Sequence, residues 1–210
     1  MKLSLPLSAV LAVSAALLVG NVFSQDKPAA KDKKGKDQPG APDLEAMMKK
    51  WEAAATPGPA HQALEPLVGE WEVSSKWYMA PDAPPLESKG TSSTRWILGK
   101  RFLQDDFAGD FMGKPMKGLG LTGYDNLKKK YVGVWVDESG TGIFTNEGTA
   151  DAAGKVFTFH GKMDDPMTGE KDKEMKFILR LLSSDKHTFE MHDLSKGNKS
   201  LCAEMTYTRK

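Results

Sequence analysis

The chain has 210 residues, with 29 Lys and Arg against 28 Asp and Glu, four His, one Cys and 40% hydrophobic residues. This composition excludes a polytopic membrane protein and a wholly disordered chain, and a net charge of +1 provides no strongly basic surface for nucleic acid. Because one Cys closes no intramolecular disulfide and builds no multi-thiolate metal site, we expect a soluble domain of ordinary composition.

Residues 1–24 have the pattern of an export signal. Lys2 supplies a positive start, Leu3 to Val19 is mostly apolar, and Val22-Phe23-Ser24 is a suitable cleavage site before Gln25. The apolar run is shorter than the roughly 20 residues that span a bilayer, so no integral membrane span is expected once the signal is removed. An uncleaved N-terminal anchor is the alternative. The pattern predicts a secreted or periplasmic protein.

Residues 25–42 and 43–58 differ sharply in character. The first segment holds five Lys, three Asp and no large apolar residue, which is typical of a flexible spacer. In the second, Leu44, Met47, Met48 and Trp51 recur at helical spacing, which predicts an amphipathic helix followed by a linker. We expect this helix to brace the domain that follows it.

Residues 59–210 are predicted to form a β domain. It begins with a second short helical turn at 61–67, and the strands follow this turn. Alternating apolar and polar residues, separated by turn signals, predict about ten strands. These strands are 71–79, 87–98, 101–107, 116–124, 131–137, 142–150, 155–161, 174–182, 187–193 and 201–209.

Short strands at this spacing, with no helical pattern between them, favour an all-β fold. An antiparallel up-and-down barrel of about 8–10 strands is preferred over a sandwich, because closure removes the exposed edges that invite aggregation. The G-x-G-x-x-G run at Gly118–Gly123 lies within a strand pattern, so we interpret these glycines as permitting barrel curvature or the close approach of a ligand, and not as a nucleotide site.

Two resemblances sharpen this prediction. Gly69-Glu70-Trp71 at the first strand and Arg209 in the last resemble lipocalin-like (calycin) barrels, which implies that Trp71 closes one end with Arg209 across its ring. The stretches 67–73, 123–137, 165–169 and 207–210 are similar to a bacterial family catalogued as domain of unknown function 1579, whose members are often exported. The resemblance covers roughly residues 61–210. It implies a small β domain and no established activity.

The sequence suggests three kinds of function. The first is binding of a small hydrophobic molecule or lipid inside the barrel, with lining residues Trp77, Trp96, Trp135, Phe157 and His160. The second is a haem-binding protein or a His-dependent enzyme, in which His160 or His187 would serve. The third is a structural envelope protein without a ligand.

We identify no catalytic set and no metal site. No G-x-S-x-G motif occurs, and the acidic loop beginning at Asp164 carries Pro166 and Met175 where a calcium loop needs oxygen ligands. A filled barrel core is the alternative to a ligand cavity.

Overall fold

The computed structural model describes residues 43–80 and 83–210, and the predicted signal and spacer lie outside them. Residues 43–210 form one unit. Helix α1 (Leu44–Ala55) comes first, followed by the short helix α2 (Pro59–Gln62) and the 3-10 turn η1 (Glu65–Leu67). A further 3-10 segment, η2 (Leu194–Lys199), precedes the last strand.

Ten strands follow η1 in the described part of the chain. They are β1 (Gly69–Trp77), β2 (Leu86–Ile97), β3 (Phe102–Phe111), β4 (Lys114–Asp125), β5 (Lys130–Asp137), β6 (Phe144–Ala150), β7 (Val156–Met163), β8 (Lys173–Ser183), β9 (Lys186–Asp193) and β10 (Leu201–Arg209).

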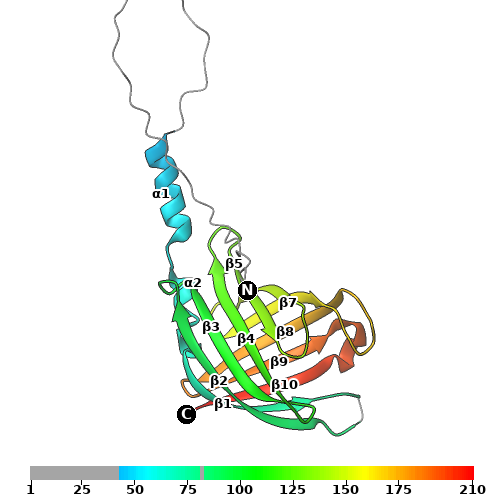
Figure 1. Ribbon diagram of the computed structural model, residues 1–210. Coiled ribbons are helices and arrows are strands. Elements are labelled where there is room, and N and C mark those ends of the chain that lie inside the picture. Colours follow the sequence, from blue (N-terminus) through cyan, green and yellow to red (C-terminus); the bar gives the residue numbers. More distant parts are fainter. Residues whose placement is uncertain (1–42, 81–82) are drawn as a thin grey trace, which may run out of the picture. The chain divides into compact units, whose positions relative to one another are not determined.

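Each strand pairs antiparallel with its neighbours in sequence, and β1 pairs with β10, so the sheet closes into a barrel (Figure 1). The prediction of an all-β, up-and-down barrel is therefore confirmed. The helical turn expected over 61–67 divides into α2, which begins at Pro59, and η1, which has Pro66 as its second residue.

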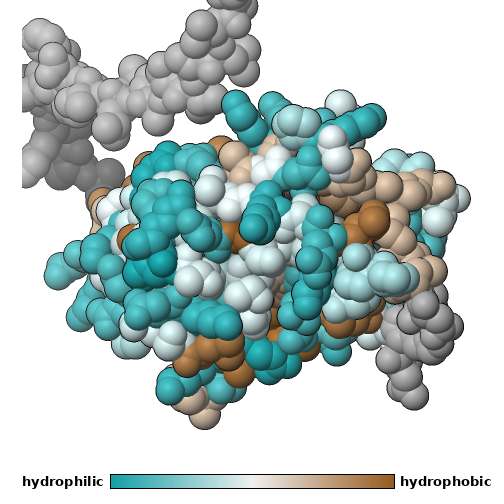
Figure 2. Space-filling view, turned by 90° about the horizontal axis from the view of Figure 1, so that it is seen from below, coloured by the Kyte–Doolittle hydropathy of each residue, from teal (hydrophilic) through white to brown (hydrophobic). Residues whose placement is uncertain are grey.

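The strands alternate between an inner and an outer face. Along β1, Trp71, Val73 and Ser75 are buried, whereas Glu70 and Glu72 are exposed. Hydrophilic side chains cover much of the outer face that Figure 2 shows, and hydrophobic ones gather in smaller patches. On β4 and β5 the outer face also carries apolar residues, among them Leu121 and Val134. The inner face of the barrel is therefore the candidate surface for a ligand-binding site.

Helix α1 forms as predicted, but none of its residues is buried. Asp43 caps it by accepting a hydrogen bond from the Ala46 amide, and the exposed fractions of Leu44 and Trp51 are 70% and 67%. Its C-terminal end is held to the barrel through Asn126, whose side-chain amide donates to the carbonyls of Ala54 and Thr56. The expectation of a helix that packs against the barrel as a brace was wrong.

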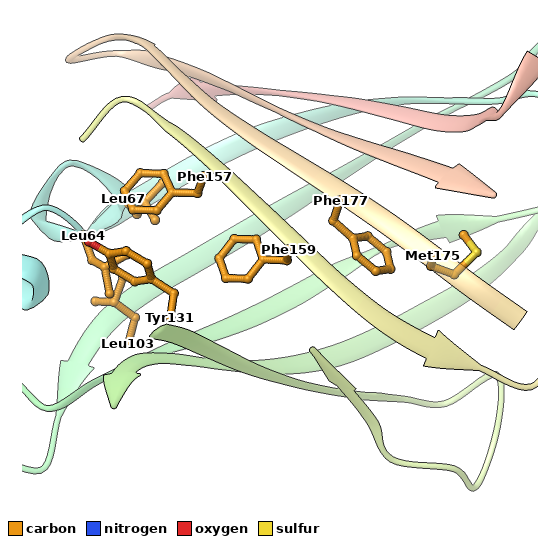
Figure 3. Packing of buried hydrophobic residues seen from close by; sticks show 8 residues of the cluster. All are labelled: Leu64, Leu67, Leu103, Tyr131, Phe157, Phe159, Met175 and Phe177. Atoms are coloured by element: carbon orange, nitrogen blue, oxygen red, sulfur yellow. The ribbon is translucent and has the colours of Figure 1, made fainter. Parts of the chain in front are cut away.

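The segment that closes the barrel is α2 with η1. Leu64 and Leu67 enter one end and pack with Leu103, Tyr131 and Phe157, which gather beside them in Figure 3. The Tyr131 hydroxyl donates to the Ala60 carbonyl. We call this packed end, made of Leu64, Leu67, Leu103, Tyr131 and Phe157, the floor of the barrel.

Trp71 and Arg209 complete the floor. The Trp71 indole N–H donates to the Leu67 carbonyl, and the Arg209 guanidinium carbon lies 4.2 Å from the Trp71 ring centroid. Arg209 also donates to the carbonyls of Val68 and Pro66. This is the arrangement that the calycin resemblance implied.

Position 69, two residues before Trp71, requires a glycine. Its φ is +144°, and a Cβ at this position would lie 2.1 Å from Arg209 Nη1. The glycine is thus required both by the backbone conformation and by the close approach of the guanidinium.

Among residues 43–80 and 83–210, no helix is long and apolar enough to cross a membrane.

Candidate functional site

The interior of the barrel is filled at the floor and less completely filled beyond it. Fully buried apolar residues gather at the floor, and Phe159, Phe177 and Met175 continue from it along β7 and β8 (Figure 3). Other large inward-facing side chains remain partly exposed. These are Trp77, Phe107, Phe111, Met116, Trp135, Phe144, Leu179, Phe189, Met191 and Met205.

Aromatic rings form the walls of this upper interior. Trp77 meets Phe111 edge-on at 4.8 Å, and Phe177 stacks on Phe189 at 5.7 Å between ring centroids. Trp135 lies against β4, where a Cβ at Gly118 would be 2.2 Å from its ring. Gly118 belongs to the G-x-G-x-x-G run, so the structure places this run in a strand and gives Gly118 a packing role.

A group of polar side chains points into the barrel above the floor. Asp105 on β3 accepts hydrogen bonds from the hydroxyls of Ser92 and Thr94 on the adjacent β2. Burial raises the pKa of Asp105, and these two hydrogen bonds only partly oppose the rise. Asp105 is thus a carboxyl group in an otherwise largely apolar interior.

His187 and Tyr207 belong to the same polar group. Their rings stack at 4.3 Å, and the edge of His187 meets Trp71 at 4.4 Å. Burial, and secondarily the charge of Arg209, lowers the pKa of His187 to about 4, so its imidazole is neutral near pH 7. Burial and the nearby Asp105 raise the pKa of Tyr207. Both side chains face the interior of the barrel, since Asp105 shares its strand face with the buried Leu103 and Tyr207 shares its strand face with the buried Ala203.

One ring nitrogen of His187 has no hydrogen-bond partner. Its Nδ1 is buried without a donor or acceptor in the described part of the chain, and the side chain is only 5% exposed. The indole nitrogen of Trp77, farther from the floor, is in the same condition. Buried polar atoms are usually satisfied, so these two are suited to meeting a bound molecule or water.

Lys173 anchors the loop between β7 and β8 at the opposite end from the floor. Its ammonium lies 2.7 Å from Asp165, 3.1 Å from Glu170 and 3.5 Å from Asp193, and the side chain is 9% exposed. The hydrogen bond with Asp165 holds the pKa of Lys173 above and that of Asp165 below its usual range. The acidic residues of this loop are thus occupied by lysine, and no group of three metal-ligating side chains occurs in residues 43–80 and 83–210.

The residues proposed from sequence occupy three different places. Trp77 and Trp135 face the upper interior. Phe157 is fully buried in the floor, and Trp96 lies at its edge, where the indole donates to Glu65 at 2.8 Å. His160 is exposed on the outer face, opposite Glu147 on β6. Phe157 and His160 therefore do not line the unfilled space.

His160 lies outside because of strand alternation. Phe157 and Phe159 point inward on β7, so the residue between Phe159 and Gly161 must point outward. The polar residues missed by sequence reasoning are Asp105, Ser92 and Tyr207. A usable signal was present, because Asp105 shares its strand face with Leu103 and Phe107.

Two hollows lie at the ends of the barrel wall. One of about 300 Å³ lies beside the floor and is lined by Gly58, His61, Glu65 and Trp96, among others. The other, of about 270 Å³, lies at the ends of β4 and β5 near Gly118 and Asp137. Neither is lined by the interior polar group of Asp105, His187 and Tyr207, which we treat as the candidate site together with the aromatic walls.

The fold defines a closed antiparallel β-barrel protein of ten strands in the described part of the chain, capped at one end by a helical turn and by an Arg over a Trp. A family model described as "Protein of unknown function (DUF1579)" matches residues 56–209, and the chain belongs to this family. No curated protein sequence matches the chain.

Two solved structures share the fold. Rv2717c from M. tuberculosis has 20% identity and a TM-score of 0.54, with 74% of this chain and 99% of that chain covered. The S-type phycobiliprotein lyase CPES from Guillardia theta has 13% identity and a TM-score of 0.50, with 77% and 96% covered. Both likenesses support the barrel architecture.

Proposed function

We propose that this protein binds a small hydrophobic molecule inside the barrel. The observation that carries the proposal is the incomplete filling of the upper interior: large aromatic and Met side chains point inward yet remain partly exposed. A filled core would leave such side chains buried, as Phe157 and Phe159 are.

Such a ligand gains affinity mainly by removing apolar surface from water. Burial contributes roughly 25 cal/mol per Å² of apolar surface, and wall residues of the Met type adapt to ligands of different shape. Of the lining residues predicted from sequence, Trp77 and Trp135 belong to the walls in this proposal. Barrels of about eight or more strands commonly hold one small ligand in this way.

The residues present do not fit haem. His160 points away from the interior, and the ring of His187 is covered by Tyr207 on one face and meets Trp71 at its edge. With 5% of its surface exposed, His187 has no free approach for a porphyrin iron. A hydrophobic ligand without a metal is the better match to this interior.

The first experiment is a fluorescence titration with the neutral apolar probe N-phenyl-1-naphthylamine. We expect saturable binding to the purified protein, and at least about tenfold weaker binding to Met205→Trp, which places a larger side chain in the unfilled space. Met167→Trp is the matched control, because Met167 is 67% exposed on a loop. Haemin added to the same protein should produce no shifted Soret band.

Two results would contradict the proposal. One is the absence of saturable probe binding to the folded wild-type protein. The other is unchanged probe affinity in Met205→Trp, provided that its circular dichroism spectrum and urea midpoint show a folded barrel.

We also propose that the protein acts after export. The support is the pattern of residues 1–24, whose positive start, apolar run and small residues before Gln25 are typical of a signal peptide. In a secreted or periplasmic setting, a binding barrel would meet hydrophobic molecules outside the cytoplasm.

A further inference from the structure

The interior of the barrel holds a carboxyl group that no cation neutralises. Asp105 points inward from β3, between Leu103 and Phe107 on the same face. It takes part in no ion pair within residues 43–80 and 83–210, whereas its outward neighbour Asp106 pairs with Arg95. An unpaired carboxylate in an apolar interior is costly, so a partner that donates a hydrogen bond would be strongly favoured there.

Arg209, the cationic residue near His187, already has hydrogen-bond partners at the floor. Arg209 donates to the carbonyls of Val68, Pro66 and Ser184 and lies over Trp71. It therefore remains at the floor and does not turn toward Asp105. His187 is neutral near pH 7 and contributes no compensating charge.

Neighbouring polar atoms widen the site beyond one carboxyl group. His187 Nδ1 is buried without a partner in the described part of the chain, and Tyr207, whose ring stacks on His187, is half-buried. Ser92 and Thr94 hold Asp105 in place by donating to one of its oxygens, Oδ1, which leaves the other available. The cluster is thus preorganised and incompletely satisfied.

We propose, on the basis of the function proposed above, that the barrel selects hydrophobic molecules whose polar head donates hydrogen bonds, a hydroxyl or an ammonium group, and that Asp105 receives this head. The apolar body lies among Phe107, Trp135 and Phe189. A carboxylate head is disfavoured, since it would bring a second negative charge against Asp105 with no cation to separate them.

The test compares three ligands of equal chain length that differ only in the head group. Dodecylamine and dodecanoate, each below its critical micelle concentration, and dodecanol, below its solubility limit, are titrated against the protein loaded with N-phenyl-1-naphthylamine. We expect the amine and the alcohol to displace the probe at concentrations at least about tenfold lower than dodecanoate, as befits a charge-assisted hydrogen bond.

Asp105→Asn and Asp106→Asn form a matched pair of variants. Asp105→Asn should lower the affinity for dodecylamine about tenfold relative to that variant's own affinity for the neutral probe, and it should narrow the difference in affinity between dodecylamine and dodecanoate. Asp106→Asn, which alters an identical group on the outer face, should leave all three ligands unchanged.

The outcomes separate this inference from the proposed function. If the probe does not bind, the proposed function fails. If the probe binds but dodecanoate displaces it as well as dodecylamine does, only the head-group inference is overturned. It is also overturned if Asp105→Asn folds, binds the probe and retains the wild-type preference for the amine.

Discussion

His187 illustrates how position inside the barrel alters the chemistry of a side chain. It shares strand β9 with His192, yet His192 donates or accepts hydrogen bonds with Ser200 and Glu190, whereas His187 Nδ1 has no partner in the described part of the chain. Burial against Trp71 and Tyr207 holds the pKa of His187 at about 4. One strand thus carries a histidine with hydrogen-bond partners, His192, and a histidine with an unpartnered ring nitrogen, His187.

This pKa predicts a specific loss of stability in acid. The unfolded state, with a His pKa of 6.5, binds a proton more readily than the folded state, so the free energy of unfolding falls as the pH is lowered from 6.5 to about 4. A shift of this size corresponds to about 3 kcal/mol. In His187→Phe, which retains an aromatic ring, urea midpoints measured at about pH 7 and about pH 4 should differ less than in the wild type.

His160→Gln provides the control for this measurement. His160 is exposed on the outer face, so its replacement should leave the full acid dependence of the wild type. If His187→Phe loses stability in acid as steeply as His160→Gln does, the assignment of this effect to His187 is wrong.

At the scale of elements, two helical segments that both carry apolar side chains have different roles. Helix α1 carries Leu44, Met47, Met48 and Trp51 on its surface, all at least half exposed, and buries none of its residues. The shorter α2 and η1 segment inserts its apolar side chains into the barrel. Helical periodicity alone does not distinguish the two, because it reports an apolar stripe and not what covers the stripe.

Matched leucine substitutions test this difference between the helices. Leu64→Ala should lower the free energy of unfolding by about 2–5 kcal/mol, because Leu64 is 1% exposed and its removal leaves a cavity in the floor. Leu44→Ala, at a position 70% exposed, should change it by less than about 0.5 kcal/mol. Urea denaturation followed by tryptophan fluorescence measures both, and equal effects would show that α1 packs on the barrel.

At the scale of the whole molecule, closure of β10 on β1 joins the two ends of the β domain. This pairing runs from Trp71 opposite Arg209 to Trp77 opposite Ala203, and it leaves no free edge in the described barrel. The single Cys202 is free. The fold is therefore held by closure and packing, without a disulfide.

Export predicts a defined mature chain. Protein recovered from its own host should have the intact mass of residues 25–210, because the signal pattern ends at Ser24. The measurement is mass spectrometry of the protein in a cell-envelope or culture-medium fraction. Recovery of the full-length chain from the cytoplasm would contradict the proposal.

Much of the barrel could be predicted from sequence because strand alternation is a local property. Period-two patterns identified ten strands, and Gly69, Trp71 and Arg209 identified the closed end. The same alternation assigns Asp105 to the inner face and His160 to the outer face, although only the strand register makes the consequence plain. The candidate walls Trp77 and Trp135 were accessible to this reasoning, whereas the grouping of Asp105 with His187 and Tyr207 was not, because these residues lie on strands far apart in the sequence.

The sequence by itself determined the strands, their faces and the residues that close the floor. Only the tertiary structure decided which inner residues meet, that Phe157 is fully buried in the packed floor, and that α1 stays exposed. It also placed Asp105 on β3 and Tyr207 on β10 on the inner face of one closed barrel. The physical reason is that alternation depends on adjacent residues, whereas contacts across a barrel depend on the stagger of ten strands and on closure.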